Sequence, residues 1–178
     1  MTVRLRGDRV LLRAFHEAEL PLLWEREVEA AVGDPPEDTP EARERLYERL
    51  RRSGEWTEQE LRLAVEADGA LAGDLQARRS NWTIPPWVAE LGIGLFPEAR
   101  GKGIGTDALR TVCRYLFEEE GFLRVQLSTD VANDAMRRSA EKAGFSYEGV
   151  LRGFWPEGDE IHDYAMYGRT RADHDHER

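Results

Sequence analysis

The chain has 178 residues, of which 40% are hydrophobic and 34% charged, a composition typical of one globular domain with a substantial core. Its formal net charge of −10 argues against a general nucleic-acid-binding protein, which normally presents a basic face, and is compatible with a cationic substrate. The first ten residues carry arginines instead of the apolar core of a signal peptide, and no apolar run is long enough to span a bilayer.

We therefore expect a single cytoplasmic domain over residues 1–170, a monomer or homodimer with no nucleic-acid or membrane partner. Residues 171–178 are polar, and we expect a loose tail there. His174 and His176 in this tail do not by themselves predict a metal site, and none is predicted elsewhere. The single cysteine, Cys113, falls on an apolar helical stripe, which favours a buried core residue over a catalytic thiol.

The first half of the chain predicts strands and two helices. Residues 3–15 favour a strand broken near Gly7, residues 17–30 a first helix, and Thr39 is placed to cap a second helix that runs to about residue 52. Alternating apolar residues at 61–67 and 71–77 flank Asp68-Gly69, a strong hairpin turn.

The second half alternates strands and helices. Residues 87–96 predict a strand, the apolar stripe at 108–117 a helix that ends at Gly121, and residues 123–127 a further strand. Asn133 is placed to cap a short helix that reaches Gly144, and residues 145–152 and 161–169 predict a final strand pair. This order predicts an α+β or mixed α/β domain, mostly antiparallel, in which the crossover after residue 96 places two strands parallel.

A turn rich in glycine, residues 97–106, lies between a predicted strand and an amphipathic helix. Gly101, Gly103 and Gly105 remove side chains, so backbone N–H groups at the helix start can approach an anion closely. Arg100 and Lys102 add positive charge within an acidic chain. The pattern predicts a phosphate-binding turn, and a tight turn without a ligand is the plain structural alternative.

Two nucleotide-binding motifs fit this turn poorly. A Walker A loop requires glycine where Phe96 stands and Ser or Thr where Gly103 stands. The dinucleotide fingerprint requires a third glycine where Thr106 stands, and its ribose-binding acid would fall within 118–120, at the end of a helix instead of a second strand.

The pattern Arg-x-x-Gly-x-Gly at 100–105 resembles the acetyl-CoA motif of the GNAT acetyltransferase superfamily. Residues 90–98 are similar to the strand that precedes this motif, and Asn133 with Glu-Lys-Ala-Gly-Phe at 141–145 resembles the signature that follows it. Residues 148–152, with Asp163 and Tyr167 beyond, resemble the RimJ/RimL-like branch of ribosomal-protein N-terminal acetyltransferases. The resemblance covers about half the chain, from 88 to 169, whereas the N-terminal half agrees only in element order.

The resemblance implies a GNAT-like fold and a site for acetyl-CoA, with no metal. The fold has a twisted, mostly antiparallel sheet, one parallel strand pair splayed at the cofactor site near 93–96 and 127–130, and about four flanking helices. Ile93 and Leu95 would border the pantetheine arm of the cofactor. The pyrophosphate would be held by the turn, formed by Arg100, Gly101, Lys102, Gly103, Ile104, Gly105 and Thr106.

The resemblance also implies direct acetyl transfer to a primary amine in a ternary complex. A primary amine is protonated near neutral pH and must lose a proton before attack. Glu90 is the preferred general base, the N–H near Leu95 would stabilise the oxyanion, and Asn133 would bind the cofactor arm as well as cap its helix. The family's Tyr position is Ala140 and the branch's Ser position is Met136, so the general acid is unassigned, with Ser139 the nearest hydroxyl.

The choice of acceptor is determined largely by residues outside the motif. The first two helices and residues 156–160 border the acceptor site in the family; Glu157, Asp159 and Glu160 would attract a cation or are plain surface acids. Three tryptophans would line the cleft or simply pack: Trp82, Trp87 and Trp155. The branch favours a protein N-terminus, and aminoglycosides and polyamines remain open. The absent Tyr motivates a second hypothesis, an acyl-CoA-binding module without turnover.

Overall fold

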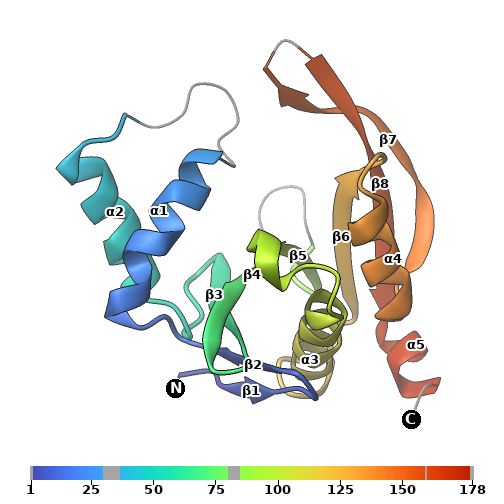
Figure 1. Cartoon of the computed structure of the whole chain (residues 1–178). Coiled ribbons are helices and arrows are strands. Elements are labelled where there is room, and N and C mark those ends of the chain that lie inside the picture. Colours follow the sequence, from blue (N-terminus) through green and yellow to red (C-terminus); the bar gives the residue numbers. More distant parts are fainter. Residues whose placement is uncertain (1, 30–36, 80–84, 159, 177–178) are drawn as a thin grey trace.

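The computed structural model in Figure 1 describes residues 2–29, 37–79, 85–158 and 160–176 of the chain. Its strands form one eight-stranded sheet in the order β1-β2-β3-β4-β5-β6-β8-β7. The strands are β1 (Leu5–Arg6), β2 (Val10–Arg13), β3 (Glu60–Ala67), β4 (Ala70–Arg79), β5 (Val88–Leu95), β6 (Arg124–Asp130), β7 (Ser146–Glu157) and β8 (Glu160–Thr170). The helices are α1 (Leu20–Glu29), α2 (Pro40–Arg51), α3 (Ile104–Glu118), α4 (Asp134–Lys142) and α5 (Arg171–His176), with short 3-10 turns at Glu17–Glu19 and Pro97–Ala99.

The sheet is mixed, as predicted. Strands β5 and β6 pair in parallel, and every other neighbouring pair is antiparallel. The parallel pair arises because α3 connects β5 to β6. This helix carries the chain back to the end of the sheet at which β5 begins, so that β6 runs in the same direction as β5. The predicted mixed α/β class is therefore confirmed.

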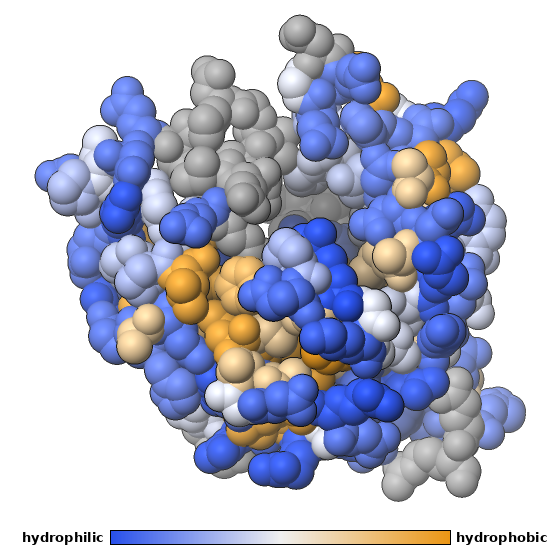
Figure 2. Space-filling view, in the orientation of Figure 1, coloured by the Kyte–Doolittle hydropathy of each residue, from blue (hydrophilic) through white to orange (hydrophobic). Residues whose placement is uncertain are grey.

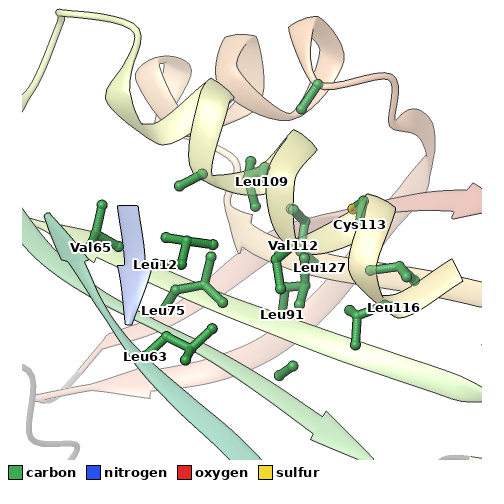
Figure 3. Close-up of a cluster of buried hydrophobic side chains, with 14 of the residues drawn as sticks. Leu12, Leu63, Val65, Leu75, Leu91, Leu109, Val112, Cys113, Leu116 and Leu127 are labelled. Carbon is green, nitrogen blue, oxygen red and sulfur yellow. The ribbon is translucent and has the colours of Figure 1, made fainter. Parts of the chain in front are cut away.

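Helix α3 covers one face of the sheet and supplies much of the core. Figure 3 shows Leu109, Val112, Cys113 and Leu116 of α3 against leucines and valines of the strands, all of them at most 4% exposed. Removing one such buried leucine costs about 2–5 kcal/mol, so the position of α3 on the sheet is strongly specified. The burial of Cys113 agrees with the expected core role.

Local sequence signals fixed several element boundaries. Thr39 Oγ1 accepts a hydrogen bond from the Ala42 N–H at 3.1 Å, and Asn133 Oδ1 accepts one from the Met136 N–H at 3.0 Å. Both residues therefore cap their helices as predicted. Asp68 and Gly69 adopt φ angles of 52° and 77°, which confirms the hairpin turn. The first helix begins as a 3-10 turn at Glu17, and the predicted end of that helix, at residue 30, lies outside the described residues.

Two expectations for the C-terminal part were wrong. Residues 171–176 form helix α5 instead of a loose tail, because His174 is buried, stacks on Phe117 at 5.2 Å between ring centroids, and bonds Glu118 at 3.0 Å. The final hairpin is also longer than predicted, since β7 continues through Pro156. Proline fits there because β7 is the edge strand of the sheet and need not donate on both sides.

Figure 2 shows a largely hydrophilic surface, with hydrophobic residues gathered between the α1–α2 pair and α3. Helices α1 and α2 have their own small core of Leu20, Leu23, Trp24, Leu46 and Leu50, against which Phe96 packs. This contact joins the two helices to the end of β5. Within the described part of the chain, no helix has the length and apolarity needed to cross a bilayer.

Candidate active site

The two parallel strands separate halfway along their length. Their pairing covers only Val88–Glu90 of β5 against Arg124–Gln126 of β6, whereas β5 continues to Leu95 and β6 to Asp130. We call the gap between residues 91–95 and 127–130 the splay. The register confirms the predicted separation of these strands, and it leaves one edge of β5 open to a ligand.

The open edge of β5 directs specific backbone groups into the splay. In the antiparallel β4–β5 pair, the Phe96 N–H bonds Ala72 O at 2.9 Å, so residues opposite each other alternate from there between bonded and non-bonded pairs. Because Phe96 is a bonded position, residue 94 also bonds to β4. Ile93 and Leu95, at the intervening positions, direct their N–H groups away from β4. Leu95 therefore presents its N–H to the splay, as an oxyanion donor requires.

The start of α3 lies beside the same end of β5. We call residues 100–106 the glycine turn. Gly101 and Gly103 adopt φ angles of 71° and 79°, a left-handed conformation that glycine adopts without steric cost. A Cβ at Gly105 would contact Leu95 Cδ1 at 3.5 Å, which places the turn next to the splay.

The first turn of α3 has N–H groups free for an anion. Its N-cap, Gly103, has no side chain to cap them, and the first helical bond runs from the Asp107 N–H to Gly103 O at 3.1 Å. The N–H groups of Ile104, Gly105 and Thr106 precede that bond and point out of the helix end. Their partial positive charge suits a phosphate.

The basic residues of the turn differ in their engagement. Arg100 Nε donates to Leu95 O at 3.0 Å, so this guanidinium folds back on β5, whereas Lys102 is exposed. The structure adds Arg9, which the sequence did not single out. Its Nη1 lies 3.5 Å from Lys102 O across 93 positions of chain, a proximity for which the sequence carries no local signal.

Glu90 lies on the opposite face of the sheet from α3. Ile93 and Leu95 pack against the core under α3, and side chains alternate along a strand, so Glu90 faces away from it. Gln126 Nε2 donates to Glu90 Oε2 at 3.2 Å, and Arg78 Nη1 lies 3.9 Å from Glu90 Oε1. Five positions separate Glu90 from Leu95, which is about 16 Å along an extended strand.

Helix α4 borders the glycine turn through Ser139. Its Oγ lies 4.0 Å from the Cβ position of Gly105, but its hydroxyl donates to Ala135 O at 2.9 Å. Ala140 is fully buried and Met136 packs against the core. Neither side chain carries an acidic proton, so neither can act as a general acid. Asn133 uses its Oδ1 for the helix cap, which leaves its NH₂ group to donate to a ligand.

A charged and aromatic cluster lies where β6 ends against the β7–β8 hairpin. His162 Nδ1 lies 2.6 Å from Asp130 Oδ2, and its Nε2 lies 3.7 Å from carboxylates of both Glu157 and Glu160. The bond with Asp130 raises the pKa of His162, and a bond from the Ala132 N–H, with that from His162, lowers the pKa of Asp130. Asp159 lies outside the described residues.

Aromatic rings adjoin this cluster. Trp155 stacks on Tyr164 at 5.9 Å between centroids, and Phe154 lies 5.4 Å from the same Tyr164. Trp87 is 55% exposed on the surface, and Trp82 lies outside the described residues. The hairpin thus places acids and aromatic faces, both favourable to a cation, at the carboxyl end of the splay.

A basic cleft of about 570 Å³ lies at the other end of the sheet, between the end of α2 and strands β3 and β4. Its arginines are Arg49, Arg52, Arg78 and Arg79, and Glu58 and Glu60 are its acids. Arg78 links this cleft to Glu90. In the part of the chain that the structure describes, no group of three His, Cys, Asp or Glu side chains is arranged to hold a metal ion.

This architecture, a mixed sheet whose parallel strands splay beside a glycine-lined helix start, defines the class of protein. A family model described as an acetyltransferase (GNAT) domain matches residues 9–146. The chain belongs to this family of acetyl-CoA-dependent acyltransferases. The match includes the N-terminal half, in which the sequence offered no specific motif.

Particular relatives narrow the comparison. YdaF of Bacillus subtilis, which carries the name "putative ribosomal N-acetyltransferase", is 35% identical over 62% of this chain and 60% of its own length. Spermidine N(1)-acetyltransferase of Escherichia coli K12 is 30% identical over 63% of this chain and 54% of its own. The chain thus spans little more than half of these two relatives. Among solved structures, RimL, a ribosomal L7/L12 alpha-N-protein acetyltransferase in complex with coenzyme A, superposes with a TM-score of 0.73 at 18% identity, covering 94% of this chain and 98% of that one.

Proposed function

We propose that the chain transfers the acetyl group of acetyl-CoA to a primary amine by direct attack in a ternary complex. The observation that carries this proposal is the splay, because it opens the Leu95 edge of β5 directly beside the glycine turn. Thioester and pyrophosphate then have adjacent places in one site.

The backbone would do most of the donor binding. The N–H groups of Gly101 through Thr106 bind the pyrophosphate, and Ile93, Leu95 and the NH₂ of Asn133 line the path of the pantetheine arm. The N–H of Leu95 polarises the thioester carbonyl and stabilises the negative oxygen that forms on attack. Such a donor typically contributes about 3–4 kcal/mol to transition-state stabilisation.

Proton transfer would pass through Glu90. The protonated amine first gives one proton to Glu90 through ordered water. The neutral amine then attacks the thioester carbonyl carbon, the C–N bond forms, the C–S bond breaks, and the second proton that the nitrogen loses goes to solvent. Water is needed because about 16 Å of strand separates Glu90 from Leu95. The leaving thiolate takes its proton from solvent, because Ala140 and Met136 offer none and Ser139 donates to Ala135 O.

The acceptor is a protein N-terminus or a small polyamine. The 35% identity to YdaF favours the former. The 30% identity to the spermidine enzyme, together with Asp130, Glu157 and Glu160 near the splay, favours the latter. Both acceptors present a cationic amine, which the acids of the β7–β8 hairpin would attract.

The test is turnover by the purified protein with acetyl-CoA and a panel of peptides, polyamines and aminoglycosides. We expect release of free CoA thiol above background with at least one amine, and mass spectrometry should find the acetyl group on that amine. Tight CoA binding in calorimetry without thiol release for any acceptor would instead indicate an acyl-CoA-binding module. Absence of CoA binding would contradict the proposed site itself.

A further inference from the structure

Arg9 lies over the glycine turn although it comes from the N-terminal hairpin. Its Cδ and Nε are both 3.9 Å from the position of a Cβ on Gly103, and its Nη1 donates to Lys102 O at 3.5 Å. The side chain is exposed, so its remaining N–H groups are accessible to a ligand. A guanidinium thus lies beside the N–H groups that start α3.

The backbone of this hairpin is fixed by a carboxylate of α3. Asp107 accepts hydrogen bonds from the N–H groups of Asp8 at 3.3 Å, Arg9 at 2.7 Å and Val10 at 3.0 Å. Gly7 lies so close that a Cβ there would come within 2.6 Å of Asp107 Oδ2. The position of Arg9 over the turn is therefore built into the packing of the hairpin on α3.

We call the three hydrogen bonds from the N–H groups of residues 8–10 to Asp107 the clamp. The clamp also reduces the repulsion that the Asp107 carboxylate would exert on an anion bound at the start of α3. A carboxylate in the first turn of a helix favours the helix but repels an anion bound at the same end. Asp107 is 9% exposed and its oxygens face three N–H donors of the hairpin, so its charge is directed away from the turn and locally compensated. The β1–β2 hairpin also places the positive guanidinium of Arg9 beside the N-terminal end of α3.

We infer that Arg9 is a phosphate-binding residue of the acetyl-CoA site, with its guanidinium donating to a phosphate of the cofactor. The inference rests on the proposed function. Arg9 complements the turn because Arg100 is already bonded to Leu95 O and Lys102 offers only a point charge. A guanidinium can donate two parallel bonds to one phosphate, a stronger and more directional contact.

The test is calorimetric titration of CoA into the full chain and its Arg9→Gln variant. Arg4→Gln is the matched control, because Arg4 is exposed on the same N-terminal segment and its loss changes the net charge equally. We expect Arg9→Gln to weaken CoA binding about 10-fold and Arg4→Gln to leave it within about 2-fold. Without CoA, the midpoint of thermal unfolding of each variant should equal that of the unmutated chain, because the hydrogen bond to Asp107 uses the backbone N–H of residue 9 and not its side chain.

Dephospho-CoA identifies the phosphate. If Arg9 binds the ribose 3′-phosphate, Arg9→Gln and the unmutated chain bind dephospho-CoA equally; if it binds the pyrophosphate, the deficit persists. Equal affinity of Arg9→Gln and the unmutated chain for CoA would overturn the inference, as would an equal loss in Arg4→Gln. Failure of the unmutated chain to bind CoA would overturn the proposed function, and Arg9 with it.

Discussion

At the scale of single residues, Glu90 has the surroundings of a carboxylate that must act at a distance. It lies on the sheet face opposite α3, between Gln126 and Arg78, and the N–H expected to hold the thioester belongs to Leu95, further along the strand. An amine that reaches the splay from this face would deliver its proton along the Glu90 side of the sheet. Only the protonated form of the amine needs that help.

Replacing Glu90 with glutamine is therefore expected to lower the acetylation rate most near neutral pH. We expect kcat/KM to fall about 10²-fold there and the difference to shrink as pH rises toward the pKa of the amine, where free amine is abundant. The measurement is the pH profile of thiol release, with Glu58→Gln as control on an exposed acid of the neighbouring cleft. Profiles that superpose for Glu90→Gln and the unmutated chain would remove Glu90 from the mechanism.

His162 makes the hairpin sensitive to pH. Its pKa is raised above the ordinary value of 6.5, chiefly by the bond to Asp130. A raised folded-state pKa contributes stability that is fully present below the unfolded pKa and is lost as pH rises through the folded pKa. Asp130 stays ionised throughout, because its own pKa is lowered.

We therefore expect His162→Gln to lower the midpoint of thermal unfolding more at about pH 5.5 than at about pH 8.5. Unfolding followed by circular dichroism at both pH values tests this, with His176→Gln on the exposed surface of α5 as control. A destabilisation that is the same at both values, or larger at the higher one, would show that the ion pair with Asp130 is not its source.

At the scale of elements, α3 offers an internal comparison because a left-handed glycine lies at each of its ends. Gly103 has φ 79° at the start and Gly121 has φ 77° just after the end, with no heavy atom within 4 Å of a Cβ at Gly121. A valine at either position incurs the same backbone cost, about 1–2 kcal/mol. Only the first position lies in the proposed phosphate site.

Gly103→Val and Gly121→Val are thus expected to lose similar free energies of unfolding in urea, while only Gly103→Val loses CoA affinity, by about 10-fold or more. Calorimetry with CoA and urea titration on both variants separate the two effects. Unchanged affinity in a folded Gly103→Val protein would contradict the placement of the phosphate.

Elements set by local chemistry were predictable from the sequence, and elements set by distant contacts were not. The caps at Thr39 and Asn133 and the turn at Asp68 follow from residues three positions apart or fewer, so their signals survive in the sequence. Helix α5 is too short to show a period, and its burial depends on Phe117 and Glu118 far upstream. The splay could be expected only by resemblance to a family, since nothing local states where two strands stop pairing.

Arg9 shows the same limit within the site. The glycine turn could be recognised from its composition. The β1–β2 hairpin, however, is joined to it by Asp107 across almost a hundred positions of chain, and no local sequence signal indicates this contact. Charge alone could not single out Arg9 among the arginines of the first strands. Three-dimensional packing was needed to tell which arginine reaches the turn.

At the scale of the whole molecule, charge is distributed unevenly along the sheet. Acids gather at the carboxyl end of the splay, at Asp130, Glu157 and Glu160, and the arginine cleft lies near the other end, beside Glu90. The chain as a whole carries −10. An acceptor approaching the splay therefore experiences both the net field and the local acids, which attract cations, unless it first contacts the cleft.

This distribution predicts acceptor selectivity and its dependence on salt. Of two otherwise identical peptides, one with lysines and one with glutamates at the second and third positions, the lysine peptide should have the higher kcat/KM, by about 10-fold at ~0.05 M salt. The advantage should narrow at ~0.5 M salt, because the screening length then falls to a few ångströms. Thiol release measured for both peptides at both salt concentrations tests this. A preference for the glutamate peptide at low salt, abolished by Arg78→Gln, would show that the arginine cleft and not the acidic hairpin selects the acceptor.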